Sequence, residues 1–149
     1  MTEVAFYQLR RTPLERALPE ILQKTLARGW RAVVLARSPE RVEALNAQLW
    51  LHSREGFLPH GSKADGYAER QPVWLTDTEE NPNGAEVLVL VDGAEAEGLD
   101  RYRRVFDLFD GNDPTTAAAA RERWQRAKAA GHAIAFWQQG ERGWEMKAD

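Results

Sequence analysis

The sequence predicts an α/β fold in which helices cover both faces of a mostly parallel β-sheet. Residues 4–49 follow the order strand, helix, strand, helix, because each of two apolar stretches precedes a segment with helical spacing of its apolar residues. A later continuous apolar run, Val87–Val91, predicts another strand that is buried on both faces. Alternating strands and helices are connected by right-handed crossovers, which produce parallel strands.

The first helix is predicted after a strand at residues 4–9. Thr12 is the expected N-cap, Pro13 suits the first helical position, and Glu15 completes a capping box. Gly29 is the expected end of this helix. Pro19 lies inside the helical pattern and should kink the helix or move its start to a later residue.

The second strand and helix follow the same logic. The apolar run 31–36 predicts a central strand. Ser38 and Pro39 then repeat the cap-and-proline signal, and apolar residues at helical spacing up to Leu49 form the inner face of the helix.

The remainder of the chain predicts further strands and one more helix. Asn81–Gly84 is a strong turn signal. Asp113 and Pro114 begin a last helix that should stop at Gly131, and the tail after Gly140 is expected to be frayed. The predicted elements are strands at 71–75, 86–91, 105–109 and 133–137, a helical turn near 99–102, and a helix from 113 to about 130.

Length and composition fit one soluble domain, residues 1–149. Hydrophobic residues make up 43% and charged residues 29%, as in ordinary globular proteins. The absence of cysteine excludes disulfides, thiolate zinc sites and cysteine nucleophiles. No apolar run reaches the roughly 20 residues that span a bilayer, and no signal peptide opens the chain. We therefore expect a cytoplasmic protein without a membrane partner.

The charge is distributed unevenly along the chain. Residues 1–54 have a net charge of +4, residues 55–100 of −9 and residues 101–149 of +2, which gives the total of −3. Binders of duplex DNA need a strong basic excess, since phosphate neutralisation supplies most of their affinity. We therefore expect contact with nucleic acid only indirectly, through another protein.

Residues 56–63 come close to a phosphate-binding P-loop. The two glycines, Gly56 and Gly61, have the right separation, but Ser62 precedes Lys63 where the motif needs lysine before serine or threonine. Pro59 lies within the loop, and no helix is predicted to follow it. We expect no functional P-loop, although a small α/β nucleotide-binding protein or enzyme stays open as the alternative function.

Other candidate catalytic or metal-binding residues have simpler explanations. Asp107, Asp110, Asn112 and Asp113 could suggest a magnesium site, but their sequence is ordinary turn chemistry and Asp113 is expected to cap a helix. The three histidines are far apart in sequence and lack the spacing of metal ligands. We expect no catalytic residue, no metal and no cofactor.

The last helix carries a candidate binding site for an acidic peptide. Arg121, Trp124 and Lys128 share one helix face at spacings of three and seven residues. Together with Arg123, they belong to a segment with a local net charge of +3. Such a face could simply be solvated, with tryptophan packed beneath the cations. The alternative is a slot in which arginine pairs with a carboxylate and an aromatic wall takes an apolar side chain.

A second candidate site lies where the second helix ends. Trp50 and Phe57 flank a short loop that continues with Pro59 and His60. Aromatic residues in loops either pack into a core or meet a partner. Because the loop holds no evident chemistry, we interpret it as a docking surface, with Trp50 and Phe57 partly exposed.

Several of these stretches, in order along the chain, resemble the chi subunit of bacterial DNA polymerase III, an accessory protein of the clamp loader. The likeness covers nearly the whole length. It is carried by Phe6-Tyr7 with Leu9, Leu49-Trp50, Phe57–Gly61, and Ala120–Trp124 with Gly131.

The resemblance implies a three-layer, Rossmann-like fold and a replication adaptor without a catalytic site, although the assembly it serves is a DNA polymerase. Such proteins bind the acidic C-terminal tail of single-stranded DNA-binding protein. By this resemblance Arg121 grips the carboxylate end of the tail and Trp124 is the aromatic beside it. A lysine that contributes in family members is Ala117 here, so Arg123 or Lys128 would supply that charge.

The resemblance also implies a second partner. The surface of Trp50 and Phe57, with Pro59 and His60, would receive the psi subunit or, in some members, a helicase or another clamp-loader protein.

Overall fold

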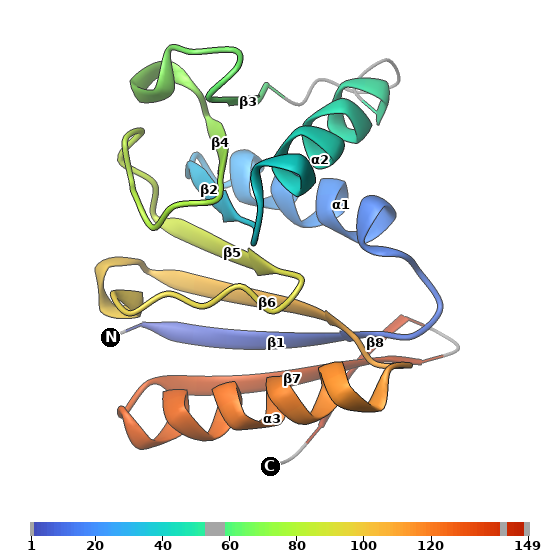
Figure 1. Ribbon diagram of the computed structural model, residues 1–149. Helices are drawn as coiled ribbons and strands as arrows, with labels where there is room; N and C mark the ends of the chain where they lie inside the picture. The colour runs from blue at the N-terminus through green and yellow to red at the C-terminus, as the bar shows by residue number, and fades with distance from the viewer. Residues whose placement is uncertain (1, 53–58, 141–142, 148–149) are drawn as a thin grey trace.

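One mixed sheet of eight strands forms the centre of the molecule (Figure 1). The computed structural model describes residues 2–52, 59–140 and 143–147. In these residues the strand order is β3-β4-β2-β5-β6-β1-β7-β8, and every neighbouring pair is parallel except β7 and β8. The predicted α/β class with a mostly parallel sheet is confirmed. The bounds of the elements are β1 (Glu3–Leu9), α1 (Leu14–Ala27), β2 (Ala32–Leu35), α2 (Pro39–His52), β3 (Gly61–Ser62), η1 (Ala68–Arg70), β4 (Val73–Thr76), β5 (Val87–Val91), η2 (Leu99–Arg101), β6 (Arg104–Asp110), α3 (Pro114–Ala129), β7 (Ala133–Gly140) and β8 (Gly143–Lys147).

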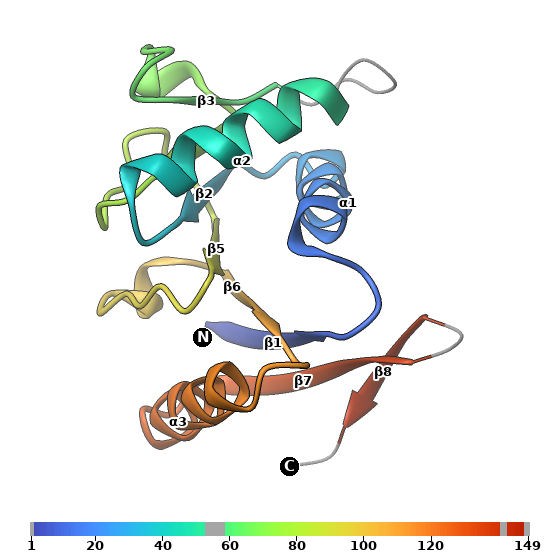
Figure 2. The ribbon, with the colours of Figure 1, turned by 45° about the vertical axis from the view of Figure 1, so that its right-hand side comes forward.

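The helices pack on opposite sides of this sheet (Figure 2). Helices α1 and α2 bury Leu18, Leu22 and Leu45 against one face. Helix α3 buries Ala120 and Ala127 against the other face, over β6, β1 and β7. Side chains alternate between the two faces of a strand. In β2, for example, Val34 belongs to the first core and Val33 to the second.

Two helix starts and two helix ends agree with the predictions. Ser38 Oγ accepts a hydrogen bond from the Arg41 amide at 3.1 Å, and Asp113 caps α3 by accepting from the Thr115 amide at 3.0 Å. Gly29 and Gly131 follow the ends of α1 and α3 with φ of +80° and +89°, a backbone region that glycine occupies without strain.

The start of α1 differs from the prediction. Its N-cap is Pro13, with no side-chain cap, because the Thr12 hydroxyl instead accepts a hydrogen bond from Gln139 Nε2 at 2.6 Å. The helix begins at Leu14 and continues through Pro19, so the expected later start is wrong. Pro19 lies in the second turn, where its missing N–H costs one bond to the first turn, and its buried ring packs into the interior.

The expected fraying after Gly140 is also wrong for part of the tail. Residues 143–147 form β8, which pairs antiparallel with β7. Trp144 holds this strand against the sheet, since its ring packs edge-on against Tyr7 with centroids 5.0 Å apart. The short strand β3 and the turn η1 were not predicted. In the described ranges no helix is both long and apolar enough to cross a membrane.

Candidate functional site

Helix α3 presents two very different arginines to its surroundings. Ala120, Arg123 and Ala127 are buried and follow the helical spacing of a face turned to the sheet. Arg121 lies on another part of the helix and is exposed. It makes no hydrogen bond or ion pair with any described residue. The guanidinium of Arg121 is therefore exposed and unpaired among the described residues.

Arg123 is engaged inside the protein. Its Nε donates to Asp107 Oδ2 at 2.7 Å and its Nη2 donates to Oδ1 at 3.0 Å. Arg123 is 8% exposed and Asp107 1% exposed. Burial raises the pKa of Asp107 above its usual value, and the guanidinium of Arg123 offsets part of that rise. The expectation that Arg123 is an exposed flanking cation is wrong.

Trp124 and Lys128 form a small unit beside Arg121. The Lys128 ammonium lies 5.1 Å from the centre of the Trp124 indole, within the range of a cation–π interaction. Trp124 is half-buried against the second core, as are Ala117, Ile134 and Phe136. The buried indole N–H of Trp124 finds no acceptor in the described part of the chain.

A cavity of about 340 Å³ lies on the other side of α3 and was not predicted. Its apolar wall includes Phe6 and Leu90, and Arg126 and Glu95 are at its rim and bond to each other. Helical periodicity is enough to predict that Arg126 and Arg121 lie on different faces of α3. The cavity itself could not be predicted, because it is also lined by the loop after β5, whose position does not follow from the sequence. Arg121 does not line it.

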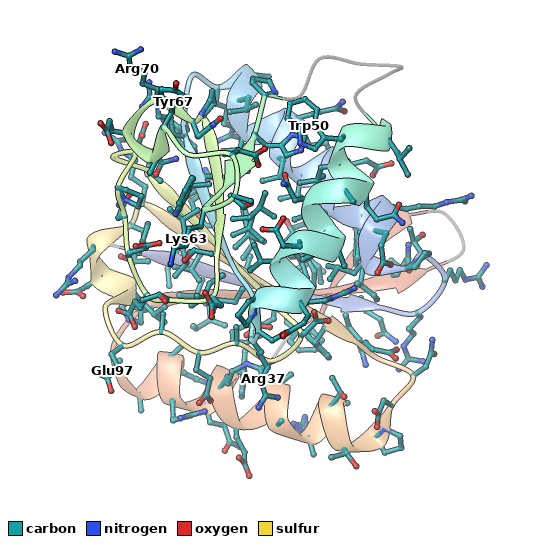
Figure 3. All side chains as sticks on the ribbon, turned by 45° about the horizontal axis from the view of Figure 1, so that its top comes forward. Arg37, Trp50, Lys63, Tyr67, Arg70 and Glu97 are labelled. Carbon is teal, nitrogen blue, oxygen red and sulfur yellow. The ribbon has the colours of Figure 1, made fainter. Side chains whose placement is uncertain are left out.

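The second predicted surface is only partly described. Trp50 is 49% exposed at the end of α2, and the neighbouring Leu51 is 55% exposed. Figure 3 shows Trp50 on the same side of the molecule as Tyr67, which is 73% exposed. The expected exposure of Trp50 is confirmed, whereas Phe57 lies outside the described residues.

His60 and Pro59 lie behind this surface to different degrees. His60 is buried, at 2% exposed, and its Nε2 lies 3.3 Å from the Asn46 carbonyl oxygen. Its ring centre is 4.3 Å from that of Trp50. Pro59 is half-buried. His60 therefore supports Trp50 from within and does not itself face a partner.

The carboxyl ends of β1 and β6 border a crevice of about 560 Å³. In parallel sheets, ligands often bind where neighbouring strands send their connections to opposite faces, as β1 and β6 do here. Arg41 in its wall already pairs with Glu15 at 3.0 Å and with Asp92 at 2.6 Å. The charge of Arg41 is therefore largely neutralised by the chain itself, while Arg10 and Arg11 also line the crevice.

The turn after β6 contains ordinary structural hydrogen bonds. Asp110 accepts from the Asn112 amide at 2.9 Å, and Asp113 caps α3. Among the described residues no group of histidine, aspartate or glutamate side chains could hold a metal ion. Of the P-loop-like segment, residues 56–58 lie outside the description, and the Ser62 hydroxyl donates to Glu43 at 2.7 Å.

Comparison with known proteins identifies the family. Residues 1–135 match the family described as DNA polymerase III chi subunit, HolC. One relative, the probable DNA polymerase III subunit chi of Rickettsia prowazekii (strain Madrid E), is 33% identical over 109 residues. That alignment covers 73% of this chain and 66% of the relative, so the chain spans just under two thirds of the relative's length. The match over most of the chain shows that this protein belongs to the chi-subunit family of DNA polymerase III.

Proposed function

We propose that this replication accessory protein is a non-catalytic adaptor that binds the acidic C-terminal tail of single-stranded DNA-binding protein. The proposal rests on a difference between two arginines of α3. Arg123 is buried and hydrogen-bonded to Asp107, whereas Arg121 is exposed and has no partner among the described residues. An exposed guanidinium beside a half-buried indole suits a peptide that ends in an apolar residue and a free carboxylate.

Each member of the site has its own part in this binding. Arg121 pairs with the terminal carboxylate, and Trp124 shields that contact from water. Lys128, held over the indole, attracts the acidic residues that precede the end of the tail. Ala117 offers no charge, so Lys128 is the flanking cation in place of a lysine at that position.

Calorimetry with a synthetic tail peptide tests the proposal. Arg121→Ala should weaken binding by about tenfold or more, because a charge-assisted hydrogen bond contributes about 1.5–3 kcal/mol. Lys128→Ala should cost less, and its effect should fade as salt rises, since the contact is exposed. The parent affinity should be about micromolar, because the disordered tail loses entropy when it binds.

Arg126→Ala is the matched control. Arg126 is equally a surface arginine of α3, but it pairs with Glu95 on a different face of the helix. It should leave tail binding unchanged. Full binding by Arg121→Ala, or equal binding of a tail peptide without its last residue, would place the site elsewhere.

The second part of the proposal is the link to the clamp loader. The exposed aromatic surface of Trp50, with Phe57, would receive the psi subunit or another clamp-loader or helicase protein, in the cytoplasm where replication proceeds. The two cores on opposite faces of the sheet also support classing the fold as three-layer and Rossmann-like.

A further inference from the structure

One face of the sheet carries a group of aromatic side chains at the margin of the core that α1 and α2 cover, and three of them, Tyr7, Phe106 and Trp144, pack partly against that core. On the side opposite α3, no helix of the described chain covers β1, β7 and β8 (Figures 1 and 2). Tyr7 and Trp137 are paired positions of β1 and β7 and therefore point to the same face. Phe106 on β6 and Trp144 on β8 also contact Tyr7. We call these four residues the aromatic row.

The other three rings of the aromatic row each lie against Tyr7. Tyr7 stacks on Trp137 with centroids 6.3 Å apart and an interplanar angle of 11°. Phe106 meets Tyr7 edge-on at 5.7 Å, and Trp144 does so at 5.0 Å. All four rings are half-buried, and Met146 beyond them is 64% exposed. The face is thus aromatic, and each of its four rings keeps part of its surface exposed.

Three arginines gather at one end of this face, around Trp30. The guanidinium carbons of Arg28, Arg104 and Arg103 lie 5.2, 5.4 and 5.9 Å from the centre of the Trp30 ring. In the described ranges, none of the three forms an ion pair or a side-chain hydrogen bond. Three like charges within one small area repel one another. An anion bound there would relieve that repulsion.

Arg104 connects the arginine group to the aromatic row. It shares a strand face with Phe106, two residues further along β6. Burial raises the pKa of Tyr7, the Glu3 carboxylate raises it further and the Arg104 guanidinium lowers it, so both charged groups lie near that hydroxyl. Glu3 lies opposite Arg104 across β1 and β6 and opposes its charge, although the two are not within ion-pair distance. Arg28 and Arg103 are exposed beyond them.

We propose that the aromatic row and the arginines around Trp30 form a contact site for single-stranded nucleic acid. Bases stack on aromatic side chains whatever their sequence, and arginines neutralise the phosphates of the same strand. An acidic peptide would satisfy the arginines and leave the aromatic row unused, whereas a single strand uses both. The net charge of −3 still argues against a dedicated duplex binder, so this contact is local and weak.

Part of the site lies outside the family match. The matched region ends at residue 135, whereas Trp137, Trp144 and all of β8 follow it. The hairpin of β7 and β8 therefore extends the open face with two of the four aromatic residues.

Fluorescence anisotropy with a labelled oligothymidylate and a duplex of equal length tests the inference. The single strand should bind more tightly than the duplex at low salt. Three phosphate contacts predict a slope of about −2 for log K against log salt. The double variant Arg28→Ala/Arg103→Ala should reduce the magnitude of that slope by about 1.4, since each lost contact to a single strand removes about 0.7. Trp144→Leu, which keeps an apolar contact with Tyr7, should cost about fivefold or more through lost stacking.

Arg70→Ala provides the matched control, because Arg70 is an exposed cation on the far connection between β3 and β4 (Figure 3). This variant should leave both the affinity for the oligothymidylate and its salt dependence unchanged. Equal binding of duplex and single strand, binding unaffected by the double arginine variant, or loss of binding in Arg70→Ala would overturn the inference. A dimer of the parent protein in sedimentation that dissociates in Trp144→Leu would also overturn it, because the aromatic row would then be an interface between two copies of this chain. Arg28 and Arg103 are exposed, so replacing them should not unfold the protein. The double arginine variant therefore tests the inference even if Trp144→Leu fails to fold.

The two proposals fail separately. The nucleic-acid variants lie away from α3 and should bind the tail peptide like the parent. Arg121→Ala should in turn bind the oligothymidylate like the parent.

Discussion

Arg123 holds Asp107 through two hydrogen bonds of 2.7 and 3.0 Å beneath α3, where both side chains are almost completely buried. The pair joins the helix to the middle of β6. A buried ion pair recovers its desolvation cost only while both partners are present. The pair therefore fixes how α3 lies on the sheet, and with it the direction in which Arg121 points.

Replacing Arg123 should destabilise the protein strongly. Arg123→Leu leaves the Asp107 carboxylate buried without a partner, and we expect a loss of about 3–5 kcal/mol in the free energy of unfolding. Arg126→Leu, on the exposed side of the same helix, should change it by about 0.5 kcal/mol or less. Urea unfolding measures both. A small effect of Arg123→Leu would mean that water or a rearranged side chain takes over the pairing.

The same carboxylate should give stability a particular dependence on pH. Burial raises the pKa of Asp107 in the folded state, so the folded protein binds this proton more readily than the unfolded chain does. The contribution of Asp107 to the free energy of unfolding is therefore fully present below the ordinary aspartate pKa. It is lost as pH rises through the raised pKa that Asp107 has in the folded protein. The unfolding free energy of the parent minus that of Asp107→Asn should fall as pH rises from about 4. A difference that rises over this range would show that Arg123 outweighs burial.

Trp50 should matter for binding and little for folding. Because half of its surface is in water, Trp50→Ala should cost about 1 kcal/mol or less of stability. Trp74→Ala is the matched control, since Trp74 is only 5% exposed and should cost about 3–5 kcal/mol. Thermal and urea melts give both values. Binding of a purified psi subunit should weaken in Trp50→Ala, and a collapsed melting temperature would instead assign Trp50 to the core.

Gln139 should be needed to hold the β7–β8 hairpin to the body of the protein. Its Oε1 accepts from the amides of Arg10, Arg11 and Thr12 at 3.1, 2.7 and 3.0 Å. Gln139→Ala should speed hydrogen exchange at these amides and cost about 1–3 kcal/mol. Gln139→Glu keeps an acceptor and should retain protection of the same amides. Unchanged exchange in Gln139→Ala would mean that solvent or another group caps them equally well.

Local signals predicted most elements of the fold. The caps at Ser38 and Asp113 and the glycines after α1 and α3 act within a few residues, so the sequence contains all that determines them. Strand order was not available in this way, because pairing depends on how the crossovers fold back. The interaction between Thr12 and Gln139 spans 127 positions, and it displaced the predicted cap of α1.

The candidate site was predicted in the same uneven way. The helical spacing of Arg121, Trp124 and Lys128 was enough to place them near one another. The burial of Arg123 was not predicted, because a charged residue is normally exposed. Its desolvation cost is offset only by the ion pair with Asp107 on β6, which the sequence does not reveal. The strand β8 was missed because it is short, with only Trp144 and Met146 apolar among its five residues. It is held by Trp144 packing on Tyr7, near the other end of the chain.

The two ends of the sheet bear on how the protein behaves at high concentration. Unpaired edge strands invite further strands from other molecules, and short or charged edges discourage them. Here β3 has two residues, and β8 has five with Glu145 among them. Neither offers a long apolar template for strand addition. Contacts with other proteins are therefore expected through side-chain surfaces. Such contacts form and dissociate without any exchange of backbone hydrogen bonds.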